Sequence, residues 1–170
     1  MPLIGVSIAV PDPCGSELQG YRVSLGDEDA RRIPTHITLL PPTDLADHSL
    51  DDVVTHLDAA AESCDPFPIH LRGTGTFRPT SPVVFVGVVE GISECELLAK
   101  SVCSGPLEVD LEFPYHPHVT IAHHRPEAVL DRAFAELAGF ECEFEVREFW
   151  LYEFDDGTGW VPRHAFRLAG

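Results

Sequence analysis

Two copies of one short motif carry the side chains best suited to chemistry. The first copy places His36 two residues before Thr38, and the second copy places His118 two residues before Thr120. In a β-strand, side chains at i and i+2 point to the same face, so each histidine is expected to project beside its own threonine. If the two strands face each other, two imidazoles and two hydroxyls surround one small group.

This set of side chains fits the in-line cleavage of a phosphodiester. With an ordinary pKa of about 6.5, one imidazole can take a proton from the attacking oxygen while the other gives a proton to the leaving oxygen. Threonine hydroxyls can donate hydrogen bonds to the nonbridging oxygens without adding charge. We therefore expect His36 and His118 to be an acid–base pair and Thr38 and Thr120 to hold the phosphate, with no metal ion and no cofactor.

The apolar pattern predicts the elements that must position these residues. Strands are expected at 3–10, 35–40, 67–77, 83–89, 118–122, 142–154 and 160–168, and helices at 15–25, from 50 to a break at 64–66, at 92–103 and at 126–139. Each motif strand is followed by a helix, a strand, a turn and a strand. The repeated order predicts an α+β bilobal fold: two pseudo-symmetric antiparallel sheets with outer helices and a central cleft, forming a single domain of two interleaved lobes over residues 1–170.

The composition and net charge of the chain limit the kinds of molecule that it can bind. The chain has 170 residues, of which 44% are apolar, enough for a core. It has 11 Lys and Arg against 28 Asp and Glu, a net charge of −17 that repels long nucleic acids but leaves a small nucleotide or an RNA end as a substrate. Without a long apolar run or a basic N-terminal segment, we expect a cytoplasmic monomer that does not associate with membranes.

The cysteines show no pattern typical of pairing. The five cysteines are odd in number and scattered, with no C-x-x-C spacing: Cys14, Cys64, Cys95, Cys103 and Cys142. We therefore expect free structural or surface thiols, and neither a disulfide framework nor a zinc knuckle.

The motifs, written out as Pro34-Thr35-His36-Ile37-Thr38-Leu39 and His116-Pro117-His118-Val119-Thr120-Ile121-Ala122, resemble those of the two-histidine (2H) phosphoesterase superfamily. The resemblance is greatest to its branch of 2′-5′ RNA ligases and LigT-like cyclic phosphodiesterases, and it extends over nearly the whole chain. It implies a bilobal fold and metal-independent chemistry on 2′,3′-cyclic phosphates or 2′-5′ linkages, with His118 as base and His36 as acid. Where many relatives carry a basic residue, often Arg, shortly after the second motif, this chain has His123, which replaces a permanent cation with a titratable one.

Supporting residues and rival functions complete the hypothesis. Phe77 and Tyr115 are candidates to stack on a base, and His123 is a candidate to contact the substrate. Alternatively, His116, His118 and His123 could bind zinc in a metallohydrolase, although that interpretation leaves His36 unexplained. Two further functions compatible with the motifs are a module that grips a phosphate without turnover and a 2′-5′ RNA ligase. Opening of a 2′,3′-cyclic phosphate is the function that the sequence favours.

Overall fold

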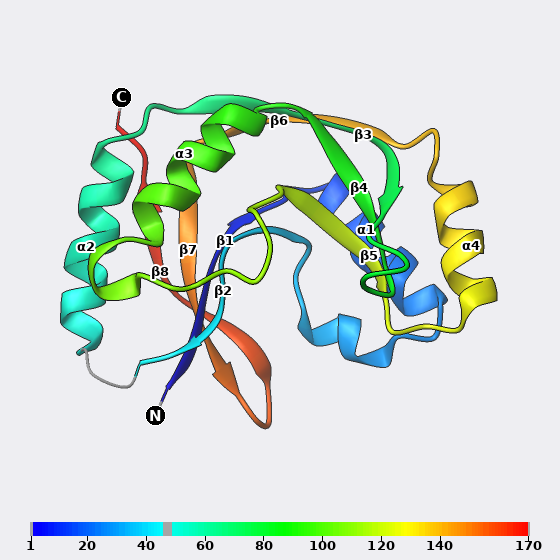
Figure 1. Ribbon diagram of the computed structural model, residues 1–170, viewed down its shortest axis with the longest axis horizontal. Coiled ribbons are helices and arrows are strands. Elements are labelled where there is room, and N and C mark those ends of the chain that lie inside the picture. Colours follow the sequence, from blue (N-terminus) through cyan, green and yellow to red (C-terminus); the bar gives the residue numbers. More distant parts are fainter. Residues whose placement is uncertain (1, 46–48, 170) are drawn as a thin grey trace.

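Two four-stranded antiparallel sheets lie side by side and carry helices on their outer faces (Figure 1). The computed structural model describes residues 2–45 and 49–169. The first sheet has the order β2-β1-β7-β8 and the second the order β5-β4-β3-β6. In chain order the elements are β1 (Leu3–Ala9), α1 (Cys14–Ser24), η1 (Glu28–Arg32), β2 (His36–Asp44), α2 (Leu50–Glu62), β3 (Phe67–Thr76), β4 (Val83–Glu90), α3 (Ile92–Val102), η2 (Gly105–Leu107), β5 (His118–His123), α4 (Glu127–Glu136), β6 (Glu141–Val146), β7 (Glu148–Asp155) and β8 (Gly159–Arg167).

The two motif strands occupy equivalent positions. Each is the edge strand of its sheet and pairs with the strand that precedes it in the chain, β2 with β1 and β5 with β4. The connecting helices exchange sides: α1, which follows β1, packs on β5, and α3, which follows β4, packs on β2. This repeated exchange gives the pseudo-symmetric α+β arrangement expected from the sequence, and it brings the edges β2 and β5 into contact.

The expected strand at 142–154 is wrong, because the chain there forms two strands in different sheets. β6 belongs to the second sheet and β7 to the first, with Arg147 between them. The buried side chains fall on even positions in β6 (Cys142 and Val146) and include odd positions in β7 (Phe149 and Leu151). A single strand cannot change its buried face in this way, so the chain crosses between the sheets at Arg147. The lobes are therefore not the two halves of the sequence.

Local features of the helices and strands follow the sequence elsewhere. The Ser49 hydroxyl accepts a hydrogen bond of 3.1 Å from the amide of Asp52 and caps α2 as expected, and α2 buries Val53 and Leu57. β2 continues through the prolines at 41–42, past its expected end at residue 40. A strand at a sheet edge tolerates proline, because one side of its backbone has no strand partner. Within the described residues, no helix is long and apolar enough to cross a membrane.

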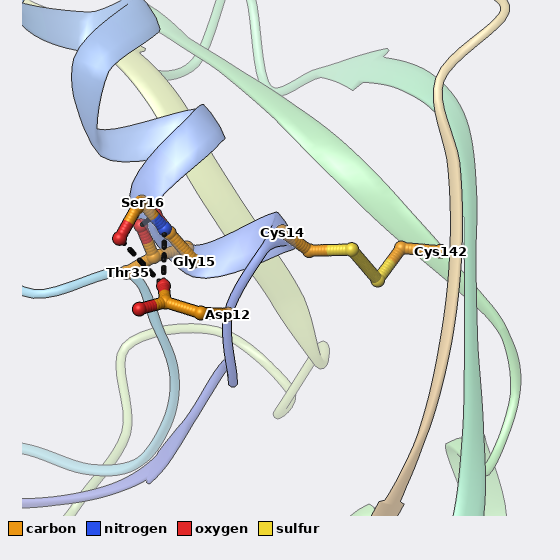
Figure 2. Close-up of a disulfide and its surroundings, with 6 residues drawn as sticks. All are labelled: Asp12, Cys14, Gly15, Ser16, Thr35 and Cys142. Carbon is orange, nitrogen blue, oxygen red and sulfur yellow. Dashed lines mark hydrogen bonds between the residues drawn. A yellow bond between two sulfur atoms is a disulfide. The ribbon is translucent and has the colours of Figure 1, made fainter.

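A disulfide joins Cys14 at the start of α1 to Cys142 on β6, which corrects the expectation that all cysteines are free (Figure 2). The other three, Cys64, Cys95 and Cys103, are free thiols. Sequence spacing gave no signal, because the pair is separated by 128 residues and meets only when α1 lies against the second sheet. Beside the bond, the buried Thr35 hydroxyl donates a hydrogen bond of 2.5 Å to the carbonyl of Gly15. The start of α1 is thus anchored to the residue that precedes the first motif histidine.

One hydrogen bond joins the first motif strand to the segment that leads into the second. The Tyr115 hydroxyl, from the segment that leads into β5, donates to the carbonyl oxygen of Thr38 on β2 at 2.8 Å. Burial raises the pKa of Tyr115, so its hydroxyl stays protonated and remains a donor. The first motif is therefore held against the second by a group that lies only three residues before His118.

Breaking the disulfide should lower the stability of the fold. Closing a loop of this length restricts the unfolded chain, so reduction is expected to cost up to about 5 kcal/mol in the free energy of unfolding. The measurement is urea unfolding of the oxidised protein with and without a dithiol reductant. A Cys142→Ser variant serves as the control, because its stability should not respond to the reductant. Equal unfolding midpoints for the wild-type protein in both conditions would contradict the expectation.

Removing the Tyr115 hydroxyl should weaken the contact between the sheets. The Tyr115→Phe variant keeps the ring and loses one hydrogen bond, so we expect a loss of about 0.5–1.5 kcal/mol in thermal or urea unfolding. Tyr152→Phe is the matched control, because the buried Tyr152 makes no hydrogen bond through its hydroxyl to a described residue. A loss no larger than that of the control would show that the bond between Tyr115 and Thr38 contributes nothing.

Candidate active site

The first motif histidine is held by its own backbone. His36 begins β2, and its Nδ1 lies 2.7 Å from the carbonyl oxygen of Pro34. Because a carbonyl oxygen only accepts, Nδ1 carries the hydrogen of this bond. The second ring nitrogen, Nε2, is then left to take or give a proton.

The second motif repeats this arrangement. His118 begins β5, and its Nδ1 donates to the carbonyl oxygen of His116 at 2.7 Å. In both motifs the acceptor is therefore the carbonyl two residues before the histidine. The chain orients two imidazoles in the same way, and neither Nε2 has a hydrogen-bond partner among the described residues. The sequence pattern alone did not reveal this local contact.

All seven residues selected from the sequence line two adjoining cavities. Thr38, Phe77, Tyr115, His118, Thr120 and His123 line a cleft of about 650 Å³. His36 lies beside it, in a smaller cavity of about 90 Å³ whose wall also contains Tyr152 and Trp160. Thr38 belongs to both walls, so it marks the point where the two cavities meet. The two motifs are thus brought together around Thr38, although the histidines line neighbouring cavities and not one shared cleft.

The surroundings of the two histidines favour their neutral forms. Burial lowers the pKa of His36, and the charge of Arg22 on α1 lowers it further, against the opposing effect of the Pro34 carbonyl. Burial likewise lowers the pKa of His118, aided by the charges of His116 and His36. The charge of His36 thus acts on the protonation of His118. An anion bound between them would raise both pKa values and allow one histidine to hold a proton.

Two aromatic rings support His118 from one side. The Phe77 ring lies edge-on to the His118 ring at a centroid distance of 5.0 Å, and the Phe85 ring lies 5.3 Å from it. Phe77 also packs against Phe85 at 4.6 Å. Phe77 therefore packs against His118, a contact that the sequence analysis did not predict for it. The sequence analysis also did not select Phe85. The residue that could have pointed to Phe85 is Gly75, a glycine within the expected strand. It pairs with Phe85 across the sheet, and a Cβ at this position would lie 2.5 Å from the Phe85 ring.

The other predicted substrate contacts have distinct environments. The Tyr115 hydroxyl already donates a hydrogen bond to the Thr38 carbonyl, so Tyr115 makes a structural contact in the wall of the cleft. His123 is exposed at the end of β5, with its ring 3.8 Å from that of His124. Partial burial, followed by the charges of His124 and Arg22, lowers the pKa of His123. Near neutral pH this position is therefore largely uncharged.

The zinc hypothesis has less support from the geometry. His116, His118 and His123 all line the cleft. In the part of the chain that the structure describes, however, no three His, Cys, Asp or Glu side chains form a group that could hold a metal ion. The arrangement instead offers two oriented imidazoles and two hydroxyls, a set suited to moving protons around a small anion.

The match to a known family extends over most of the chain. The model of the 2′-5′ RNA ligase superfamily matches residues 10–158. A protein of Bacillus thuringiensis (strain Al Hakam) named "Putative phosphoesterase" is 30% identical over 144 residues, covering 81% of this chain and 80% of the relative. Two solved structures share the fold: E. coli LigT complexed with 3′-AMP (TM-score 0.66, 21% identity, 100% of both chains) and TT0787 of Thermus thermophilus (TM-score 0.69, 22% identity, 99% of this chain and 98% of that one). Because the family model spans both histidine motifs, the chain belongs to the 2′-5′ RNA ligase superfamily of two-histidine phosphoesterases, as the sequence resemblance indicated.

Proposed function

We propose that this phosphoesterase opens 2′,3′-cyclic phosphates on nucleotides or RNA ends by acid–base catalysis, without a metal ion. The observation that carries the proposal is the matched pair of histidines, each with Nδ1 bonded to a carbonyl oxygen and with an Nε2 that bonds to no residue within 2–45 and 49–169. LigT of E. coli, which shares the fold, has been crystallised with 3′-AMP, ATP and NADP⁺. These ligands favour a small nucleotide as the substrate of this chain as well.

The reaction requires one proton transfer at each side of the phosphorus. In our assignment, Nε2 of His118 accepts a proton from water as the water oxygen bonds to phosphorus. The ester bond to one ribose oxygen breaks, and protonated His36 gives that oxygen its proton. Thr38 and Thr120 donate hydrogen bonds to the nonbridging oxygens as negative charge shifts onto them. The product is a phosphomonoester next to a free hydroxyl, and one proton has moved from one histidine to the other by way of water and substrate.

Both histidines should be needed for turnover. We expect His36→Ala and His118→Ala each to lower kcat by about 10²–10⁴-fold, because each removes one proton-transfer group. Thr38→Ala and Thr120→Ala should cost at most about 10²–10³-fold, since each removes one neutral donor. The measurement is hydrolysis of a 2′,3′-cyclic nucleotide in the presence of EDTA, with His164→Ala as the control because His164 is exposed on β8 and lines neither cavity.

Two outcomes would contradict this proposal. Near-wild-type turnover of either histidine variant would remove the acid–base pair, and a phosphate-binding module would become the better interpretation. Loss of wild-type activity in EDTA, with recovery on adding zinc, would favour the metallohydrolase.

The rate should be greatest on the acidic side of neutrality. Catalysis needs one neutral and one protonated histidine, and burial lowers the pKa of both in the free protein. A plot of kcat/KM against pH should therefore be bell-shaped with its maximum below about 6.5, and its limbs belong to the coupled pair. His116→Gln keeps the backbone acceptor but removes a neighbouring charge that lowers the pKa of His118, so it should move the bell to higher pH. A rate that stays constant up to pH 8 would contradict the proposed roles.

A further inference from the structure

The segment that leads into β5 exposes apolar side chains on the wall of the cleft. Leu111 is 44% exposed and Phe113 is 56% exposed, and both line the cleft that contains His118 and Thr120. Their neighbours Val109 and Tyr115 pack against the core, but these two residues do not. An exposed aromatic ring beside a polar reaction site commonly marks a ligand contact, because folding alone gives it nothing to pack against.

The charges along this cleft disfavour substrates that carry more than one phosphate. Among the described residues that line it, none is Lys or Arg, and Glu112 is the only carboxylate. The remaining polar side chains are three histidines and hydroxyl groups, including those of Thr80 and Ser81. The cleft therefore lacks a permanent cation that could hold further phosphates, and Glu112 repels them.

Size and position favour the base of a nucleotide as the occupant of this wall. The cleft of about 650 Å³ lies within the range of about 300–1,000 Å³ that is typical of small-molecule sites. Because Phe113 and His118 share this cleft, a phosphate bound at the histidine directs the rest of the substrate along the same wall. A planar, uncharged base can cover an exposed ring there, and base–aromatic stacking tolerates any base.

We propose that Phe113 is the platform on which the substrate base stacks, and that Glu112 restricts the site to nucleotides whose only phosphate is the one being opened. This inference rests on the proposed cyclic phosphodiesterase activity and specifies its substrate class. Mononucleoside 2′,3′-cyclic phosphates are then preferred over RNA ends, whose preceding phosphates would approach Glu112. Phe113 and Glu112 act on specificity and take no part in proton transfer.

The test compares three substrates that differ in one feature each. They are adenosine 2′,3′-cyclic phosphate, a ribose 2,3-cyclic phosphate without a base, and a short RNA that ends in a 2′,3′-cyclic phosphate. Phe113→Ala should raise KM for the nucleotide by about 5- to 150-fold, the range expected for one base stacked on an aromatic ring. The effect on the substrate without a base should be at least several-fold smaller, and Phe113→Tyr should restore the nucleotide KM.

Charge is tested separately at the neighbouring position. Glu112→Gln should improve kcat/KM for the RNA about 2- to 5-fold relative to the nucleotide at low ionic strength, and added salt should reduce this gain. Phe134→Ala is the matched control, because Phe134 is an exposed phenylalanine on α4 that does not line the cleft. It should leave all three substrates unaffected.

The possible failures can be told apart. Equal losses on the nucleotide and on the substrate without a base would overturn the platform at Phe113, and a wild-type preference for the RNA would overturn the role of Glu112. If the wild-type protein opens none of the three substrates, the proposed activity fails. Calorimetric binding of 3′-AMP to the wild type and to Phe113→Ala then tests the platform alone, and equal affinities would reject it.

Discussion

The edges of two β-sheets meet at β2 and β5, and the arrangement of the candidate site depends on this contact. A sheet edge normally exposes unpaired backbone groups to solvent or to another chain. Here the Thr38 carbonyl on one edge accepts a hydrogen bond from Tyr115, which precedes the other edge strand. Because each histidine begins its strand, the position of one edge relative to the other determines how far apart the two imidazoles lie. Helix α1 reinforces the arrangement, since it packs on β5 while its first turn is bonded to Thr35.

The equivalent setting of the two histidines bears on the direction of the chemistry. Each imidazole is oriented by the carbonyl two residues earlier, so neither is restricted by its hydrogen bond to the role of acid or of base. Exchanging the two roles reverses the direction in which a proton passes between the histidines, so these hydrogen bonds allow a phosphoester reaction to run in either direction. Charge is the feature of this chain that bears on the size of its substrate: the net charge is −17, and the described residues that line the cleft include no Lys or Arg to attract the phosphates of a polymer.

Most of the framework could be predicted from local patterns, and the exceptions have physical causes. The His-x-Thr pairs, the Ser49 cap and the α2 stripe depend on neighbours in sequence, and all of these lie where the pattern indicates. The sequence predicted one strand at 142–154 where the structure has two. The buried side chains change from even to odd positions within one continuous β-rich segment, and no turn residues mark the change. The disulfide of Cys14 could not be predicted, because its partner is distant in sequence. Phe85 and Phe113 acquire their contacts with the site only when the second sheet is assembled.

The crossing at Arg147 also determines when each half of the site can form during synthesis. Strands β3 to β6 are consecutive in the chain, so the second sheet can pair as soon as residue 146 has emerged. The first sheet cannot, since β1 must wait for β7, which pairs Ile4 with Glu153. Until then β1 and β2 expose apolar residues and an unpaired edge to the cell. The first histidine motif is the earlier one to be translated, yet its sheet is the later one to be completed.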